Sequence, residues 1–340
     1  MDYKSIEHIT LNGKTYTKEE VLSISIEPNH LGEVFDFLNE WFSESIDILV
    51  QTSGSTGTPK QIAIPKQSFV ESAMNTCNFL NLNRETNALL CIPVKYIGGK
   101  MMVIRALVAG YNLWIEEPSS SPLSHFEKPC DFLAITPMQA DNCLAESPEK
   151  FTKINHVIIG GGAVSQTFIH QVKDYTTQFY STYGMTETVS HIAMQRLNGT
   201  KKSEVFELLP TYSVSLNHEN CLVIDCPTLF PNKVTTNDVA QLFPNGFKWL
   251  GRKDNVINSG GIKLSPEAIE SKIKKHHPEL TFYITSKKDD ALGEKVILVS
   301  EKEIQFNFSK MELDKYQIPK EILIETITRT ETGKIKRKKF

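Results

Sequence analysis

The stretch QTSGSTGTPK, residues 51–60, follows an apolar, β-branched run, IDILV, at residues 46–50. The run predicts a buried strand, and the Gly, Ser and Thr residues that follow predict a polar loop. Gly54 and Gly57 permit backbone conformations in which several N–H groups face one anion. The loop's side-chain donors are the ammonium of Lys60 and the hydroxyls of Thr52, Ser53, Ser55 and Thr56. This composition predicts a cradle for a polyphosphate.

Two interpretations of this loop stay open from its residues alone. A Walker A loop requires Gly immediately before Lys, and Pro59 stands there, so that motif is excluded. A polar hairpin tip has the same Gly, Ser and Thr composition and is the plainer structural interpretation. The complete string with its Pro-Lys end favours the phosphate site.

Length and charge limit the classes of protein. The chain has 340 residues, 40% hydrophobic and 23% charged, which is typical of a globular protein with two domains. A net charge of -3 favours neither nucleic acid nor an acidic membrane as partner. The start, MDYKSIEHIT, is unlike a signal peptide, and no apolar run has membrane-spanning length. The six cysteines form no CxxC pair, so we expect reduced thiols in a cytoplasmic protein without zinc.

Strand and helix patterns alternate along the first half of the chain. Apolar residues recur at helical spacing over residues 31–42. Thr17 with Glu20 and Ser68 with Glu71 have the spacing of capping boxes. Strands are predicted at residues 62–64, 88–94, 112–116, 132–136, 156–159 and 178–180. This alternation predicts an α/β fold with a mostly parallel sheet covered by helices.

Three loops after predicted strands are candidates for ligand contacts. In open α/β sheets ligands bind beside the carboxyl ends of the strands. The first loop is PVKYIGG at residues 93–99, and the second is the glycine run at 160–162, which lacks the third Gly of a dinucleotide fingerprint. The third, STYGMTET at residues 181–188, offers an aromatic ring, hydroxyls and the carboxylate of Glu187. That carboxylate is a candidate magnesium ligand beside a polyphosphate.

Without the rest of the chain, two cations in a helical pattern and the C-terminal third predict ordinary structural features. Lys100 and Arg105 fall in a helical pattern and are expected on a solvated helix face. The triplet at residues 236–238 is expected to be a polar turn. Ser265 with a following Pro predicts a helix start, and strands are expected at 280–286 and 295–300. The basic end, TRTETGKIKRKKF, is expected to be a frayed tail.

Four separated strings together change that interpretation. They are TSGSTGTPK at 52–60, YGMTET at 183–188, GRKDNVINSGG at 251–261 and GKIKR at 333–337, with GGGA at 160–163 as a weaker fifth. In this order the strings resemble the motifs of the adenylate-forming enzymes, which include acyl-CoA synthetases, luciferases and peptide-synthetase adenylation domains. The resemblance implies a large N-terminal domain, residues 1–251, with helix-covered mostly parallel sheets and a small β subdomain. It also implies a small mobile α+β domain, residues 252–340, with a hinge near Asp254.

The resemblance implies a two-step reaction with ATP, Mg²⁺ and coenzyme A. ATP and a carboxylic acid form an acyl-adenylate and pyrophosphate, and a thiol then takes the acyl group. Lys334 is implied as the catalytic lysine, Thr186 as a ligand of the reacting phosphate or carboxylate, and Glu187 as the metal ligand. Gly260 and Gly261 are implied in the thiol channel. The remaining implied nucleotide contacts are Thr52, Ser53, Gly54, Ser55, Thr56, Gly57, Lys60, Gly161, Gly162, Ala163, Tyr183, Gly184, Met185, Asp238 and Arg252.

The acid is indicated by the segment PVKYIGGKMMVIRALVAG at residues 93–110. This segment resembles that of the bacterial o-succinylbenzoate–CoA ligases of menaquinone synthesis. The resemblance implies an acyl-substrate site that includes Tyr96, Gly99 and Lys100, with Arg105 at a substrate-binding position. A fixed arginine suits an acid with a second carboxylate.

The sequence departs from the family pattern at three positions. The usual TGD is TND at 236–238, Thr328 stands where a proline is usual, and Tyr96 replaces a common His in the acyl pocket. Three alternatives stay open: another aryl- or acyl-CoA ligase, a stand-alone domain that loads a carrier protein, and a non-catalytic nucleotide-binding relative.

Overall fold

The computed structural model describes residues 1–51, 61–329 and 335–340. Its contacts divide the chain into two compact units. The first contains Met1–Val164, Val172–Ser213 and Ile224–Val234, and the second contains Ser165–Gln171, Val214–Val223 and Thr235–Phe340. Units defined by contacts do not show which part of the chain moves. The domain boundary between residues 251 and 252 therefore stays a prediction. Among the described residues, no helix is both long and apolar enough to span a bilayer.

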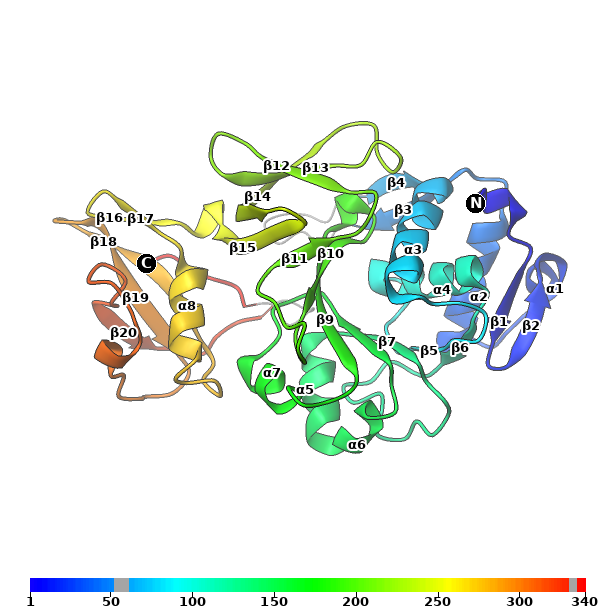
Figure 1. Cartoon of the computed structure of the whole chain (residues 1–340), viewed down its shortest axis with the longest axis horizontal. Coiled ribbons are helices and arrows are strands. Elements are labelled where there is room, and N and C mark those ends of the chain that lie inside the picture. The colour runs from blue at the N-terminus through cyan, green and yellow to red at the C-terminus, as the bar shows by residue number, and fades with distance from the viewer. Residues whose placement is uncertain (52–60, 330–334) are drawn as a thin grey trace. The chain divides into compact units, whose positions relative to one another are not determined.

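A mixed β-sheet is the centre of the first unit (Figure 1). Its strands are β1 (His8–Leu11), β2 (Lys14–Thr17), β5 (Asn87–Leu90), β6 (Asn112–Ile115), β7 (Phe132–Ile135), β8 (His156–Ile159), β9 (Gln178–Gly184), β10 (His191–Arg196) and β11 (Phe206–Leu208). They lie in the order β11-β10-β9-β8-β7-β5-β6-β1-β2. Pairing is parallel from β1 to β9 and antiparallel at both ends. The α/β prediction is therefore confirmed.

The helices of this unit pack into its core, and α4 is buried on all sides over residues 101–107. They are α1 (Lys18–Ser23), α2 (His30–Phe42), α3 (Lys66–Leu80), α4 (Ile97–Ala109), α5 (Pro137–Glu146) and α6 (Pro148–Phe151). Figure 1 shows α3 and α4 side by side, and they pack against each other. Thr17 and Glu20 form the predicted capping box of α1. The predicted box at Ser68 is wrong, because α3 already begins at Lys66 and the Ser68 hydroxyl donates to the Leu229 carbonyl.

The strand before the glycine-rich loop belongs to a hairpin. Strands β3 (Asp47–Gln51) and β4 (Gln61–Pro65) pair antiparallel in a separate two-stranded sheet. The prediction of a fully buried strand at 46–50 is wrong: Leu49 is 58% exposed, because only alternate residues of this hairpin face the core. The two interpretations of the loop are thus compatible, since residues 52–60 connect the two strands of a hairpin. The loop itself lies outside the described residues.

The second unit contains the remaining strands and the helices α7 and α8. Strands β12 (Ser213–Leu216), β13 (Cys221–Asp225), β14 (Val234–Phe243) and β15 (Gly246–Arg252) are neighbours in this order. A five-stranded sheet contains β16 (Ile257–Ser259), β17 (Ile262–Leu264), β18 (Phe282–Asp289), β19 (Gly293–Ser300) and β20 (Glu321–Ile324). In the second unit, α7 spans Gln166–Gln171 and α8 spans Pro266–Lys274. The described part of the chain also contains 3₁₀ turns at Tyr3–Ser5, Thr186–Thr188, Lys253–Asn255 and Phe308–Lys310.

Local chemistry explains most of the second unit and corrects two predictions. The Ser265 hydroxyl caps α8, as predicted, and the helix buries Ile269 and Ile273 against β18 (Figure 1). The predicted turn at residues 236–238 is wrong, because the residues lie in β14 and Asp238 pairs with Arg252 of β15. The C-terminal end is also not frayed where it is described, since the Phe340 amide donates to the Ser286 carbonyl.

Candidate active site

The carboxyl ends of the parallel strands bring the predicted loops together. Strand β5 pairs with β6 on one side and with β7 on the other. The chain therefore reverses its winding direction at β5, and open sheets bind ligands at such a reversal. Strands β5 and β8 end at Leu90 and Ile159, shortly before two of the loops selected from the sequence, and β9 ends at Gly184 within the third.

The glycine run after β8 forms an open backbone surface. A Cβ atom at Gly160 would lie 2.6 Å from the Thr182 hydroxyl, so that position admits only glycine without a shift. Gly161 has φ +85°, and a Cβ there would meet no atom within 4 Å. Gly161, Gly162 and Ala163 are exposed. Left-handed backbone with open space beside it allows a flat ligand to approach closely.

The next loop begins later than the sequence predicts, because β9 extends to Gly184. Tyr183 packs edge-on against Phe206, with ring centroids 5.9 Å apart. A Cβ at Gly184 would lie 2.3 Å from the Ser190 carbonyl oxygen, so the close pairing of β9 and β10 requires glycine. Met185 is half-buried and precedes the 3₁₀ turn.

A tight turn presents Thr186 and Glu187. Thr186 is half-buried and Glu187 is exposed in the 3₁₀ turn. The Thr188 hydroxyl donates to the carbonyls of Met185 and Ser190, which fixes the turn. Val189 has φ +67°, an unfavourable conformation for a β-branched residue. Such strain persists where the surrounding structure holds it, and it often accompanies a functional site.

Arg105 is a buried cation whose donors are only partly used. Its exposed fraction is 2%. One terminal nitrogen donates to the Ser190 hydroxyl at 3.1 Å, another lies 3.9 Å from the Met102 sulfur, and Nε has no partner among the described residues. The described carboxylates form no ion pair with it. Burial lowers the pKa of Arg105. The solvated-face prediction for this residue is wrong.

Lys100 is half-buried, and its partners belong to α2. Its ammonium lies 3.5 Å from the Glu40 carboxylate and 4.2 Å from the centre of the Phe37 ring. Burial lowers the pKa of Lys100 more than the nearby Glu40 charge raises it. The prediction of a solvated helix face is wrong here too. The ion pair between Lys100 and Glu40 joins α4 to α2.

Gly99 and Tyr96 lie at the start of α4. Gly99 is buried, and a Cβ there would lie 2.4 Å from the Pro93 carbonyl oxygen, so the loop packs directly on the helix. Tyr96 is 39% exposed, with the Lys95 ammonium over its ring. The two residues and Arg105 therefore belong to one loop and the helix that follows it.

His191 follows Ser190 and shares the buried surroundings of Arg105. Its Nε2 lies 2.9 Å from the Thr76 hydroxyl, and its Nδ1 lies 3.5 Å from the Ser190 hydroxyl. Burial, and then the charge of Arg105, lower the pKa of His191 well below its usual value. The imidazole is therefore neutral in the folded protein at neutral pH.

This neutrality predicts a pH dependence of stability. Below about pH 6.5 the unfolded chain binds a proton on His191 while the folded protein does not, so the free energy of unfolding falls as the pH decreases. His191→Gln should flatten the dependence between about pH 6.5 and 5, by up to about 1.4 kcal/mol per pH unit. Urea unfolding at several pH values measures it. His218→Gln, at an exposed histidine, is the control, and equal slopes in wild type and His191→Gln would contradict the account.

In the second unit, β14 and β15 bring Asp238 and Arg252 opposite each other. The Trp249 indole donates to the Asp238 carboxylate at 2.9 Å. Arg252 lies 2.8 Å from the carboxylate of Asp254, and the Asn237 amide donates to that same carboxylate. The Asn of the TND sequence thus restrains Asp254. Gly260 and Gly261 form the turn between β16 and β17, both with positive φ.

Several predicted residues lie outside the described parts of the chain. They are Thr52, Ser53, Gly54, Ser55, Thr56, Gly57, Lys60 and Lys334. No group of three or more His, Cys, Asp or Glu side chains that could hold a metal is found among the described residues. Glu187 as a ligand of Mg²⁺ stays a prediction.

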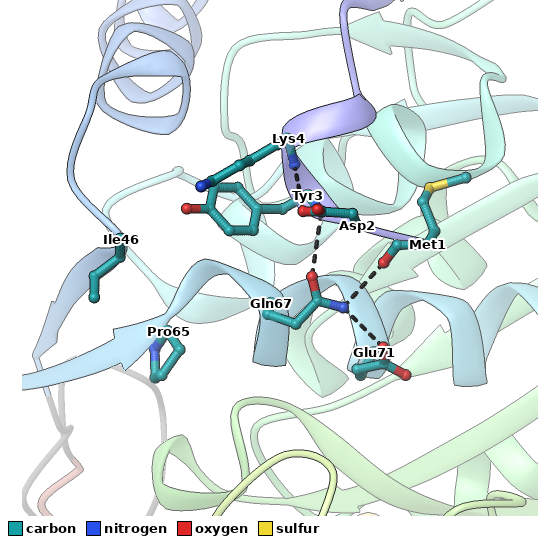
Figure 2. Close-up of a pocket in the computed structure, with 8 residues that line it drawn as sticks. All are labelled: Met1, Asp2, Tyr3, Lys4, Ile46, Pro65, Gln67 and Glu71. Carbon is teal, nitrogen blue, oxygen red and sulfur yellow. Dashed lines mark hydrogen bonds between the residues drawn. The ribbon is translucent and has the colours of Figure 1, made fainter.

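A surface hollow of about 610 Å³ lies away from these loops (Figure 2). It is lined by the N-terminal residues 1–4 together with Ile46, Pro65, Gln67 and Glu71. The Gln67 amide donates to the Met1 carbonyl and the Glu71 carboxylate, and it accepts from the Tyr3 amide. None of the described candidate residues lines it, and its Gln67 amide is already paired, so it is not the candidate site.

The sequence gives little sign of Ser190 and Trp249, which contact Arg105 and Asp238, or of His191 and Thr76, which are hydrogen-bonded beside Ser190. Ser190 and His191 follow STYGMTET directly and could have been included by continuing that motif. Thr76 and Trp249 come from a distant helix and strand. No local pattern marks them, because only tertiary packing brings them to the site.

The comparison with protein families decides the assignment. The model of the AMP-binding enzyme family matches residues 23–235. The chain belongs to the AMP-binding enzyme family. The match includes the glycine-rich loop, the glycine run after β8 and the loop after β9. The predicted hinge and the basic C-terminal motif lie beyond it.

Individual relatives agree with this assignment. The chain is 32% identical to an acyl-CoA synthetase (AMP-forming)/AMP-acid ligase II-like protein from Dyadobacter fermentans, with TM-score 0.66 and coverage of 94% of this chain and 95% of that one. It is 25% identical to a 2-succinylbenzoate–CoA ligase of Listeria monocytogenes, over 89% of this chain and 71% of that protein. The o-succinylbenzoate–CoA synthetase of Bacillus subtilis, solved with ATP and magnesium, has TM-score 0.72 at 20% identity, over 88% and 74%. The adenylate-forming fold predicted from the sequence is confirmed.

Proposed function

We propose that this protein is an AMP-forming acid–CoA ligase that converts o-succinylbenzoate to o-succinylbenzoyl-CoA in the cytoplasm. In the first step a carboxylate oxygen of the acid attacks the α-phosphorus of ATP, and pyrophosphate leaves with the electron pair of the broken P–O bond. In the second, the thiol sulfur of CoA attacks the acyl carbon, the C–O bond to AMP breaks, and the thiol proton is released.

The observation that carries the substrate assignment is the buried arginine. Arg105 is 2% exposed, and among the described residues its Nε has no partner and its charge meets no carboxylate, so the charge is costly to bury. A substrate with a second carboxylate would supply the missing partner, and the planar guanidinium can hold a carboxylate through two hydrogen bonds. Arg105 is on α4, which begins directly after the loop of Tyr96. Names of relatives that act on a dicarboxylic aromatic acid support the same assignment.

The nucleotide would lie across the carboxyl ends of the strands. We assign the adenine to the open backbone of Gly161–Ala163 and the ring of Tyr183, with Gly184 and Met185 beside it. Thr186 would contact the reacting phosphate, and Glu187 would hold Mg²⁺, which neutralises triphosphate charge when bound. The loop at 52–60 would hold the pyrophosphate part. Asp238 and Arg252 would bind the ribose hydroxyls.

The second step requires a different arrangement of the C-terminal domain. We propose that it swings about Asp254, so that Lys334 serves the first step and the turn at Gly260 and Gly261 lines the thiol path in the second. The contacts of Asp254 to Asn237 and Arg252 would then be remade on each swing. A domain that loads a carrier protein is the second candidate, supported by the same adenylation motifs.

The test is a product assay with three acids and two acceptors. The protein is incubated with ATP, Mg²⁺ and o-succinylbenzoate, with either free CoA or a phosphopantetheinyl carrier protein, and the products are read by mass spectrometry. Benzoate and a fatty acid of medium length serve as control acids. The proposal expects the CoA thioester of o-succinylbenzoate. Thioester on the carrier alone, a preference for a control acid, or ATP binding without pyrophosphate release would each reject it.

A further inference from the structure

The end of the chain is tied to the second unit by both backbone and side chain. The Phe340 amide donates to the Ser286 carbonyl at 3.0 Å, and the Lys288 amide donates to the Phe340 carbonyl at 3.1 Å. The Thr285 hydroxyl donates to the Lys338 carbonyl at 2.8 Å. Residues 335–340, here called the tail, therefore lie along β18.

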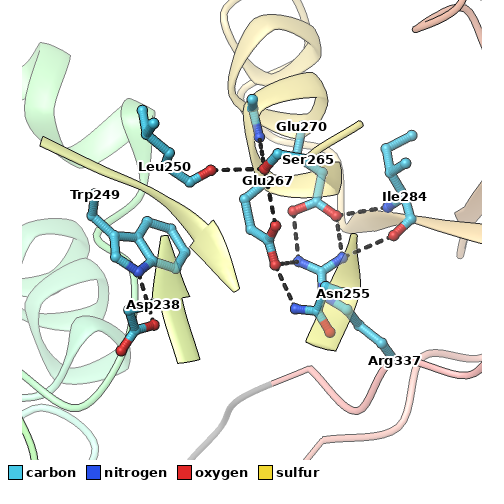
Figure 3. Close-up of polar contacts among 10 residues, drawn as sticks. Asp238, Trp249, Leu250, Asn255, Ser265, Glu267, Glu270, Ile284 and Arg337 are labelled. Atoms are coloured by element: carbon cyan, nitrogen blue, oxygen red, sulfur yellow. Dashed lines mark hydrogen bonds and ion pairs between the residues drawn. The ribbon is translucent and has the colours of Figure 1, made fainter. Parts of the chain in front are cut away.

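Arg337 joins this tail to helix α8 through a bidentate ion pair with a carboxylate. Its two terminal nitrogens contact the two carboxylate oxygens of Glu270, one of them at 2.8 Å, and Nη1 also donates to the Ile284 carbonyl at 3.0 Å (Figure 3). The side chains of Arg337 and Glu270 are 22% and 13% exposed, so solvent screens the pair little. A two-point contact of this kind fixes orientation as well as distance.

Glu267 extends the contact from the tail to the hinge segment, residues 250–255. Its carboxylate lies 3.7 Å from Arg337 and accepts a hydrogen bond from the Asn255 amide. Figure 3 shows the Glu267 carboxylate between the Asn255 amide and the Arg337 guanidinium. One carboxylate, only 10% exposed, thus serves the tail and the hinge together.

The hinge segment is also packed against the first turn of α8. The Ser265 hydroxyl donates to the Leu250 carbonyl at 2.7 Å. Gly251 has φ +136°, and a Cβ there would lie 2.5 Å from a Glu267 carboxylate oxygen and 2.6 Å from the Ser265 hydroxyl. The carboxylate therefore occupies the space that any other residue at 251 would need. Hinge, helix and tail are held by one connected set of polar contacts.

We infer that Arg337 is a positioning residue that couples the tail to the hinge segment through Glu270 and Glu267. This inference rests on the proposed function, in which Lys334, three residues before Arg337, acts in adenylation. The Arg329–Ile335 bridge and the hydrogen bond from the Lys336 amide to the Thr328 carbonyl hold the described residues on either side of it. With the Arg337 contacts present, α8, the tail and Asn255 at the end of the hinge segment move as one body when the domain swings about Asp254.

Loss of the contact has a defined kinetic consequence. Arg337 is placed at no bound group, so its removal leaves the sites for ATP and acid intact. It loosens the piece of chain that carries the catalytic lysine, and a small misplacement of a reacting group can cost on the order of 10²-fold in rate. Arg337→Ala should therefore lower kcat of adenylation by about that factor, while KM for ATP stays within about threefold.

The experiment compares Arg337→Ala, Arg337→Lys and Glu267→Gln with a matched control, Lys295→Ala. Lys295 makes a 2.8 Å ion pair with Glu321 in the same unit but away from the hinge segment. Adenylation is followed as acid-dependent pyrophosphate release. Backbone mobility is followed by hydrogen–deuterium exchange of the peptides that cover residues 250–256 and 335–340. Arg337→Lys keeps the charge without the fork and should restore only part of the rate.

Coupling predicts faster exchange in both peptides for Arg337→Ala, and in the hinge peptide alone for Glu267→Gln, which leaves Glu270 to hold the tail. The control should change neither kcat nor these peptides. The inference is overturned if the hinge peptide of Arg337→Ala exchanges at the wild-type rate, or if kcat and KM of Arg337→Ala match those of Lys295→Ala. Failure of the wild type to release pyrophosphate would reject the proposed function instead, because the exchange comparison does not depend on activity.

Discussion

Lys334→Ala is expected to slow adenylation by about 10²–10³-fold while leaving thioester formation from pre-formed acyl-adenylate and CoA nearly unchanged. Negative charge moves onto the α-phosphate and its leaving pyrophosphate in the first transition state. A cation placed there stabilises that state more than the bound substrates, which is how it raises the rate. The adenylate is already activated, so the second step has no need of this charge.

The two half-reactions are measured separately. Pyrophosphate release reports the first, and thioester formed from synthetic o-succinylbenzoyl-adenylate reports the second. Lys336→Ala removes a nearby tail cation and serves as the control for charge alone. Loss of both half-reactions to the same extent, in a protein with unchanged Tm, would reject the swing model and leave Lys334 with a structural role.

Arg105→Met is expected to raise KM for o-succinylbenzoate by roughly 30-fold or more without weakening ATP binding. Removing one partner of a buried, hydrogen-bonded charge pair costs about 2–5 kcal/mol, and each 1.4 kcal/mol is tenfold. Methionine is apolar and of comparable length, so it fills the site without the uncompensated charge. The free protein should therefore have an equal or higher Tm, since replacing a buried charge by an apolar side chain is often neutral or stabilising.

A substrate analogue isolates the contact. Benzoylpropionate has the carbon skeleton of o-succinylbenzoate without the ring carboxylate, so it has nothing to offer Arg105. The KM for benzoylpropionate should be high in wild type and should change less than about threefold in Arg105→Met. This acid has no ring carboxylate to pair with Arg105, so the substitution removes no pair from its complex. Equal effects of the substitution on both acids would show that Arg105 acts on packing and would remove the basis for the dicarboxylate assignment.

Local patterns predicted the helices and parallel strands well because those elements depend on periodicity. Val34, Phe35 and Leu38 recur on one face of α2, and all are buried. Thr17 and Glu20 fix the start of α1 by contacts three residues apart. Such elements need little information from the rest of the chain.

The errors share a different cause. Residues 236–238 have the composition of a turn, but they lie within β14, whose pairing with β15 from Asp238 onward outweighs their low strand propensity. Ser68 has capping spacing, but its hydroxyl is used by a carbonyl 161 residues away. Arg105 and Lys100 resemble a solvated helix face because burial of a charge depends on neighbours from other elements.

The same division applies to the candidate site. The strings at 160–163 and 183–188 could be found in the sequence because backbone conformation demands particular residues, as the φ of Gly161 and the close contact at Gly184 demonstrate. The unpaired Nε of Arg105 could not be foreseen, because it depends on which described side chains the fold packs around the guanidinium. The resemblance to known motifs gave the position of Arg105, and its burial gives that position a physical reason.

The most direct test of the account follows one oxygen atom. The protein is given o-succinylbenzoate labelled with ¹⁸O in both carboxylates, together with ATP, Mg²⁺ and CoA, and the nucleotide product is read by mass spectrometry. An acyl-adenylate joins the acid to the α-phosphorus through an oxygen of the acid, and that oxygen leaves with AMP when the thiol attacks. The account predicts AMP that contains one ¹⁸O per thioester formed. Unlabelled AMP, or ADP and phosphate in its place, would contradict it.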